Sequence, residues 1–146
     1  MNFWEKLKKP IMILAPMDGV TDTVFRQIVA SVGKCDVFFT EFVPVDAILS
    51  SRGHEVIKKS LQFSEIERPI VAQIWGSDPQ KFYESAKIIA KLGFDGIDIN
   101  MGCPDHSVIK KGACSALINN PKLAQEIIMA TIKDAGGLPV SVKTRI

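Results

Sequence analysis

Short apolar runs alternate with longer amphipathic stretches along most of the chain. Each run is rich in Val, Ile or Phe, which is typical of strands that are buried on both faces of a parallel sheet. The predicted strands are residues 11–15, 37–40, 70–74, 96–100 and 140–144.

Amphipathic helices are predicted between these strands from their start and stop residues. Asp78 stands before a proline, which marks a helix start, and Gly93 follows the last turn of the apolar stripe. The other predicted signals are a cap at Asp22 with a stop at Gly33, and a cap at Asn120 with a stop at Gly136 and Gly137. Between residues 44 and 69 only a short helix near residues 45–50 is predicted, followed by a polar connector.

Alternation of strands and helices predicts right-handed parallel crossovers in an α/β fold. Both a doubly wound sheet and a (β/α)8 barrel satisfy this pattern. The G-x-G-x-x-G turn of a dinucleotide-binding sheet is absent after the first strand, whereas polar residues follow the ends of successive strands, which favours the barrel. A complete barrel takes about 250 residues. We therefore interpret residues 1–146 as about the first five strands of a TIM barrel, and expect the chain to be truncated.

Composition and charge narrow the class of protein. The chain is 47% apolar and 23% charged with a formal net charge of +2, which excludes a disordered or low-complexity chain. No apolar run approaches the roughly 20 residues of a membrane helix, so we expect a cytoplasmic protein with no membrane contact. The three cysteines form no C-x-x-C pair, which favours reduced thiols.

Two residues on predicted buried strands need partners. The amide of Gln73 must either tie a loop or read the amide edge of a ligand. The cation of Lys143 needs an anion, and either an anionic cofactor or a salt bridge to Glu41 would supply one. The residues alone leave both alternatives open.

The segment D-I-N-M-G-C-P carries the strongest chemical signal in the chain. Its Cys103 lies just past a strand on a glycine-containing loop, where barrel enzymes place active-site groups. Cys103, His106 and Cys114 lack the four-ligand spacing of a zinc site, so no metal is predicted. The neighbouring Lys110 and Lys111 are placed to reach the phosphates of a polyanion.

Five ordered motifs resemble the tRNA-dihydrouridine synthases, and the resemblance covers residues 11–146. The motifs are A-P-M-D-G-V-T-D, V-A-Q-I-W-G, D-G-I-D-I-N-M-G-C-P, G-A-C-S-A-L and V-S-V-K-T-R-I. The resemblance implies a flavin mononucleotide (FMN) barrel followed by a helical RNA-binding domain. It also implies reduction of uridine in tRNA to 5,6-dihydrouridine, with NADPH recharging the flavin.

The resemblance also implies a role for particular residues. Cys103 would be the proton donor, and Asn100 and Arg145 would line the uracil pocket. The residues implied to contact FMN are Pro16, Met17, Asp18, Gln73 and Lys143.

The residue types suit this chemistry. Reducing the uracil double bond needs a hydride, which a reduced flavin supplies, and a proton on the neighbouring carbon. A thiol, with an ordinary pKa of about 8.5, holds its proton at neutral pH, whereas a typical carboxyl does not. A cation such as Lys143 would stabilise the negative charge of the reduced ring.

Two departures and two alternatives stand beside this interpretation. The family often has glycine at the position of Cys114, and the chain ends before the later flavin-phosphate loops and the RNA-binding domain, so the fragment itself is expected to be inactive. One alternative is a flavoprotein similar to dihydroorotate or dihydropyrimidine dehydrogenases, which acts on a free pyrimidine. The other is a non-catalytic half-barrel that serves as an assembly module.

Overall fold

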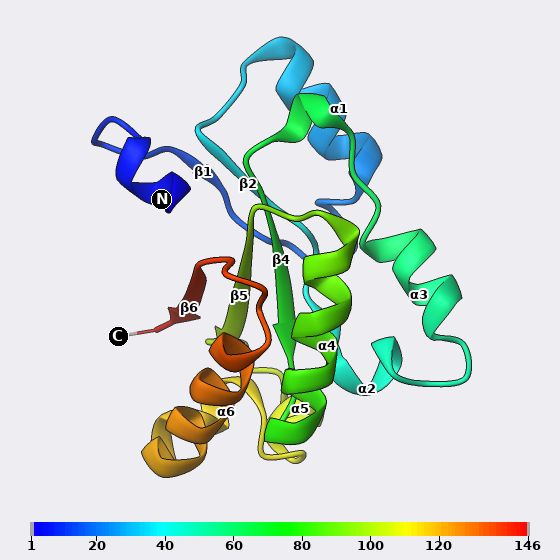
Figure 1. Cartoon of the computed structure of the whole chain (residues 1–146), viewed down its shortest axis with the longest axis vertical. Helices are drawn as coiled ribbons and strands as arrows, with labels where there is room; N and C mark the ends of the chain where they lie inside the picture. Colours follow the sequence, from blue (N-terminus) through cyan, green and yellow to red (C-terminus); the bar gives the residue numbers. More distant parts are fainter. Residues whose placement is uncertain (1, 146) are drawn as a thin grey trace.

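One all-parallel sheet runs through the computed structural model, which describes residues 2–145 (Figure 1). Its order is β1-β2-β4-β5-β6, with the short β3 paired to β4. The strands are β1 (Ile13–Leu14), β2 (Val37–Phe39), β3 (Val43–Pro44), β4 (Ile70–Trp75), β5 (Gly96–Met101) and β6 (Val140–Thr144). The sheet curls into a half-barrel, which confirms the predicted partial TIM barrel.

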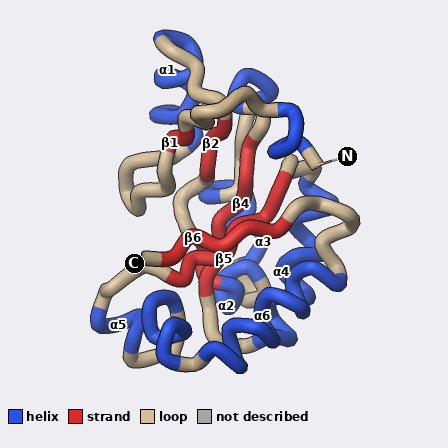
Figure 2. Tube along the Cα trace, turned by 90° about the vertical axis from the view of Figure 1, so that its left-hand side faces the viewer, coloured by secondary structure: helices blue, strands red, loops and turns tan. Residues whose placement is uncertain are grey.

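The helices lie along the outside of the curled sheet, and Figure 2 shows α2, α4 and α6 together on one side of the strands. The α-helices are α1 (Thr23–Val32), α2 (Val45–Ile48), α3 (Gly53–Ser60), α4 (Pro79–Leu92), α5 (His106–Ile109) and α6 (Pro121–Lys133). Three 3-10 segments are η1 (Phe3–Lys6), η2 (Glu65–Glu67) and η3 (Cys114–Asn119). Among the described residues, no helix has the length and apolarity needed to cross a membrane.

The predicted caps form as the sequence indicates. The side chains of Asp22, Asp78 and Asn120 each accept a backbone N–H of their own helix. Gly93 ends α4 with a φ of +83°, a left-handed conformation that favours glycine. The three caps fix where these helices begin, and Gly93 fixes where α4 ends.

The structure corrects the predicted elements in four places. The first strand covers only Ile13–Leu14 instead of residues 11–15, and α6 ends at Lys133, before the two glycines. Strand β3 has only two residues, too few for a periodic pattern. Helix α3 lies in the predicted polar connector. Its sequence did not predict a helix, because only Val56 and Ile57 mark an apolar face there.

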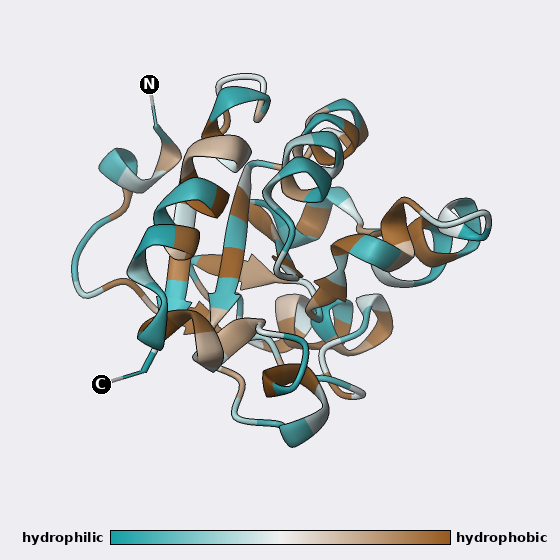
Figure 3. Ribbon diagram, turned by 90° about the horizontal axis from the view of Figure 1, so that it is seen from below, coloured by the Kyte–Doolittle hydropathy of each residue, from teal (hydrophilic) through white to brown (hydrophobic). Residues whose placement is uncertain are grey.

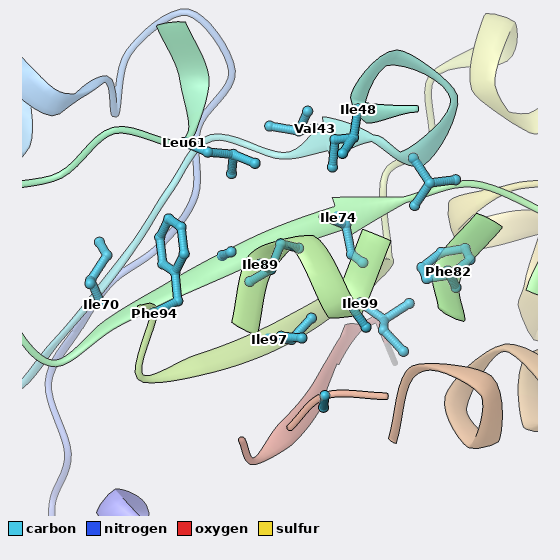
Figure 4. Close-up of a cluster of buried hydrophobic side chains, with 14 of the residues drawn as sticks. Val43, Ile48, Leu61, Ile70, Ile74, Phe82, Ile89, Phe94, Ile97 and Ile99 are labelled. Atoms are coloured by element: carbon cyan, nitrogen blue, oxygen red, sulfur yellow. The ribbon is translucent and has the colours of Figure 1, made fainter. Parts of the chain in front are cut away.

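The main core lies between the outer face of the sheet and the helices (Figure 4). Ile70 and Ile74 of β4 and Ile97 and Ile99 of β5 point into it, and Figure 4 shows Ile89 of α4 lying among them. All five side chains are fully buried. Figure 3 shows the same division, with hydrophobic positions concentrated on the strands and on the helix faces turned toward them.

The inner face of the half-barrel is apolar near its amino-terminal end. Val37, Phe39 and Val71 form a small buried cluster there, and Phe3 and Trp4 of η1 pack against it. The strand positions further toward the carboxyl end carry polar residues instead. The inner face therefore has an apolar base and a polar rim.

A buried ion pair ties α1 to the segment before β4. Arg26 Nε donates to Glu67 Oε2 at 2.6 Å, and the two side chains are 1% and 0% exposed. Arg26 also donates to the carbonyl oxygens of Thr21 and Gln62 at 2.7 and 2.8 Å. Through the bond to Thr21, the buried pair thus holds the turn between β1 and α1 in place.

Candidate active site

The loop of Cys103 is held at the carboxyl end of β5 by Asn100. The side-chain Oδ1 of Asn100 accepts the backbone N–H groups of Gly102 and Cys103, each at 3.0 Å. Arg145, just past β6, donates from Nε to the carbonyl oxygen of Gly102 at 2.8 Å. The Cys103 side chain is half-buried. The structure therefore brings the predicted proton donor and both predicted uracil-contacting residues together.

A row of buried polar side chains crosses the inner face beneath this loop. Gln73, Asp98 and Ser141 lie at the same level of β4, β5 and β6 because they are register partners. Asp98 accepts from Gln73 Nε2 on Oδ2 and from Ser141 Oγ on Oδ1, each at 2.6 Å. Gln73 Oε1 in turn accepts from Asn100 Nδ2 at 3.1 Å. The sheet register thus joins the row to the Cys103 loop.

The electrostatics of the row centre on Asp98. Burial raises the pKa of this carboxyl, and the hydrogen bonds from Ser141 and Gln73 and the charge of Lys143 act in the opposite direction. Lys143 itself is exposed and makes no ion pair within residues 2–145. The alternative salt bridge to Glu41 does not form among these residues, and Glu41 Oε1 accepts the backbone N–H of Gly19 at 2.6 Å.

The turn after β1 carries three of the predicted FMN-contacting residues. Thr21 fixes it, with Oγ1 accepting the backbone N–H of Met17 at 2.9 Å and donating to the Met17 carbonyl oxygen at 3.1 Å. Gly19 has a φ of +70°, which favours glycine at this point of the turn. Met17 and Asp18 are exposed on the turn, and Pro16 is half-buried.

One cavity lies beside the polar row and another beside the Cys103 loop. One, of about 330 Å³, is lined by Pro16, Asp98 and Lys143 together with apolar side chains such as Phe39. The other, of about 570 Å³, is lined by Asp18, Trp75, Cys103 and Lys111 among others. Met17 and Arg145 line neither cavity, and Gln73 lies fully buried between its hydrogen-bond partners. Of the predicted FMN contacts, Pro16 and Lys143 therefore line one cavity, Asp18 lines the other, Gln73 is buried and Met17 is exposed on the turn.

Cys114 packs behind the Cys103 loop. It is buried against Val108 and Ala113, and burial is the main cause that raises the pKa of its thiol to about 12. Its φ of +53° lies in the left-handed region, which explains in physical terms why glycine suits this position. The next residue, Ser115, donates its backbone N–H to the carbonyl oxygen of Cys103 at 3.3 Å.

The structure gives no support to a metal site at this loop. No group of three or more His, Cys, Asp or Glu side chains in the described part of the chain is placed to hold a metal ion. His106 is exposed at the start of α5. The cysteines Cys35, Cys103 and Cys114 are all free thiols.

Sequence reasoning missed Asp98 as a member of the site. Within β5, Asp98 and Asn100 are two residues apart, so they face the same side of the sheet. That alternation in I-D-I-N was a usable signal. Ser141 and Trp75 had no comparable signal, because a serine in a strand and an aromatic residue at a strand end are common in any buried sheet.

The comparisons with known proteins agree with the resemblance. The chain matches the family described as Dihydrouridine synthase (Dus) over residues 13–146. It is 52% identical over 145 residues to the "Probable tRNA-dihydrouridine synthase" of Staphylococcus aureus (strain COL), which covers 99% of this chain and 44% of that protein. The "Probable tRNA-dihydrouridine synthase" of Staphylococcus epidermidis (strain ATCC 12228 / FDA PCI 1200) is 50% identical with the same coverage.

A relative from another genus gives the same result. The "Probable tRNA-dihydrouridine synthase 2" of Bacillus subtilis (strain 168) is 49% identical over 145 residues, again 99% of this chain and 44% of that protein. The chain therefore spans less than half the length of these curated relatives. The family match covers nearly all of the chain, including every predicted site residue, and the chain belongs to the dihydrouridine synthase family.

Proposed function

We propose that the whole protein reduces uridine in tRNA to 5,6-dihydrouridine, with FMN as cofactor and NADPH as reductant. The observation that carries the proposal is the loop in which Asn100 holds the backbone of Cys103 beside a cavity. Family membership and the names of the relatives support tRNA as the substrate. The reaction balances as uridine, NADPH and a proton giving dihydrouridine and NADP⁺.

The residues present fit the ring of a flavin. The cavity of about 330 Å³ has apolar walls that include Pro16 and Phe39, and a polar side formed by Asp98, Ser141 and Lys143. An aromatic ring with a polar edge suits this division of surfaces. FMN supplies, when bound, a hydride that originates from NADPH. Lys143 would hold the ring's polar edge and stabilise negative charge there.

The chain's own residues would divide the remaining tasks. Cys103 Sγ would give a proton to the uracil carbon next to the one that receives the hydride. Asn100 and Arg145 would orient the uracil, since both are bonded to the same loop as Cys103. Lys111, which lines the cavity with Cys103 and lies 5.6 Å above the ring centre of Trp75, would meet a tRNA phosphate. The remaining barrel strands and the helical RNA-binding domain stay a prediction.

The test offers the purified whole protein two substrates in the presence of NADPH. One is an unmodified tRNA transcript and the other is free uridine, and the product is measured by mass spectrometry of nucleosides. We expect dihydrouridine from the tRNA alone. Reduction of free uridine only would favour the free-pyrimidine flavoprotein, and no reduction of either would contradict the proposal.

A further inference from the structure

A chain of hydrogen bonds runs in one direction from the inner face of the sheet to the Cys103 loop. Asp98 Oδ2 accepts from Gln73 Nε2, Gln73 Oε1 accepts from Asn100 Nδ2, and Asn100 Oδ1 accepts the backbone N–H groups of Gly102 and Cys103. The three side chains are 2%, 0% and 7% exposed in that order. Bulk water therefore cannot replace a missing partner in this chain.

The two backbone N–H groups fix the direction of the whole chain. A backbone N–H can only donate, so Asn100 must turn Oδ1 toward Gly102 and Cys103 and Nδ2 toward Gln73. Gln73 must then present Oε1 to Asn100 and Nε2 to Asp98. The reversed chain would set an NH2 group against two N–H donors, at about 1–3 kcal/mol for each buried group left unsatisfied.

The last member of the chain therefore has to be an acceptor, and residue 98 supplies it. We infer that Asp98 is a positioning residue for Cys103, because it is the acceptor that this orientation of the Gln73 and Asn100 amides requires, and through those amides it holds the Cys103 loop. Ser141 and Lys143 approach Asp98 from β6, on the side away from this chain. They act on Asp98 itself and carry no bond toward the loop.

Substitutions of Asp98 separate this role from simple packing. Asparagine keeps an acceptor, since its Oδ1 can accept from Gln73 while its Nδ2 faces Ser141 Oγ. Leucine has a similar volume and offers no acceptor. The inference rests on the proposed function only for the task given to Cys103, and the hydrogen bonds can be tested without flavin or tRNA.

The experiment measures amide hydrogen exchange by NMR on the whole protein without flavin or tRNA. The reporters are the N–H groups of Gly102 and Cys103. The references are those of Phe38 and Ile97, which donate to the carbonyl oxygens of Pro69 and Pro139. We expect Asp98→Leu to speed exchange of both reporters about tenfold relative to the references. The ratio of reporter to reference exchange rates should stay close to that of the unsubstituted chain in Asp98→Asn and in the matched control Ser141→Ala. Asn100→Ala should raise this ratio.

Three results would overturn the inference. They are unchanged reporters in Asp98→Leu, an equal acceleration in Asp98→Asn, or an equal acceleration in Ser141→Ala. If Asp98→Leu does not fold, the test is the exchange rate of the side-chain NH2 protons of Gln73 and Asn100 in the unsubstituted chain. They should exchange at least about tenfold more slowly than a free amide, and exchange at the free rate would also overturn the inference.

Discussion

The side-chain oxygen of Asn100 accepts the backbone N–H of Cys103 at 3.0 Å, three residues further along the chain. This bond fixes the backbone of the proposed proton donor to the strand that carries the proposed uracil contact. Asn100 lies near the carboxyl end of β5 and Cys103 follows that end directly, so their relative position follows from the strand and the turn after it. A small rigid unit therefore carries the chemistry proposed for the whole protein.

Replacing Cys103 should stop proton delivery and leave the rest of the reaction in place. We expect Cys103→Ala to slow single-turnover reduction of tRNA uridine by about a hundred- to ten-thousand-fold, the range for loss of one general acid. Oxidation of NADPH and flavin binding should change little. The measurement is quenched-flow analysis of dihydrouridine with the pre-reduced whole protein.

Cys114→Ala is the matched control for that variant. Its thiol is buried, with a pKa raised to about 12, and has no proposed task. We expect activity close to that of the unsubstituted protein. An inactive Cys114 variant together with an active Cys103 variant would move the catalytic role to the G-A-C-S-A-L loop.

Lys143→Met should lower the reduction potential of the bound flavin. The exposed cation makes no ion pair in the described part of the chain, so it is available to negative charge on the reduced ring. We expect a fall of at least about 30 mV, which is a tenfold change in a two-electron equilibrium. Lys110→Met is the control, and equal potentials in the two variants would give Lys143 a structural role only.

Asp98→Asn should raise the thermal stability at pH 7. The pKa of Asp98 is raised in the folded state, so its contribution to stability is fully present below the unfolded pKa of about 3.9 and is lost as the pH rises through the folded value. The variant avoids that loss. We expect its melting temperature to exceed that of the unsubstituted chain at pH 7, with a gap that narrows toward pH 4.

An exposed carboxylate gives the opposite sign and serves as control for that experiment. Hydrogen bonds from Ser107 lower the pKa of Asp105, so its contribution is present above the unfolded pKa and lost as the pH falls. Asp105→Asn should therefore lower or leave unchanged the melting temperature at pH 7. A destabilising effect of Asp98→Asn at every pH would show that the charged form is favoured in the fold.

Arg26→Met should destabilise the chain strongly. It leaves the Glu67 carboxylate buried without its cation, which typically costs about 3–5 kcal/mol. Urea unfolding followed by circular dichroism measures the loss. Lys81→Met, which removes the exposed ion pair with Asp46, is the control and should leave the free energy of unfolding nearly unchanged. Equal effects of the two variants would contradict the structural role of the buried pair.

The sequence predicted the parts of the fold that rest on local signals. The apolar runs of β2, β4, β5 and β6 and the caps at Asp78 and Asn120 are such signals, and they appear where they were expected. Strand β3 and helix α3 have no local signal, since their stability comes from packing against β4 and α2. Periodicity over so few residues cannot reveal them.

The predicted site was found only in part for a related reason. Residues that follow a strand directly, such as Cys103, can be placed from the order of elements alone. The surroundings of Lys143 could not, because its distance from Glu41 and the effect of its charge on Asp98 depend on which strands are neighbours. The part played by Asp98 depends on side-chain directions across three strands, which no local pattern records.

The most direct test of the account measures dihydrouridine in cells, mapped at each uridine of the tRNA. A strain that lacks the gene for the whole protein is compared with the same strain carrying the unsubstituted gene or the Cys103→Ala form. The account predicts that dihydrouridine is lost at one or more positions, restored by the unsubstituted gene and not restored by Cys103→Ala. Unchanged dihydrouridine at every position, or full restoration by Cys103→Ala, would contradict it.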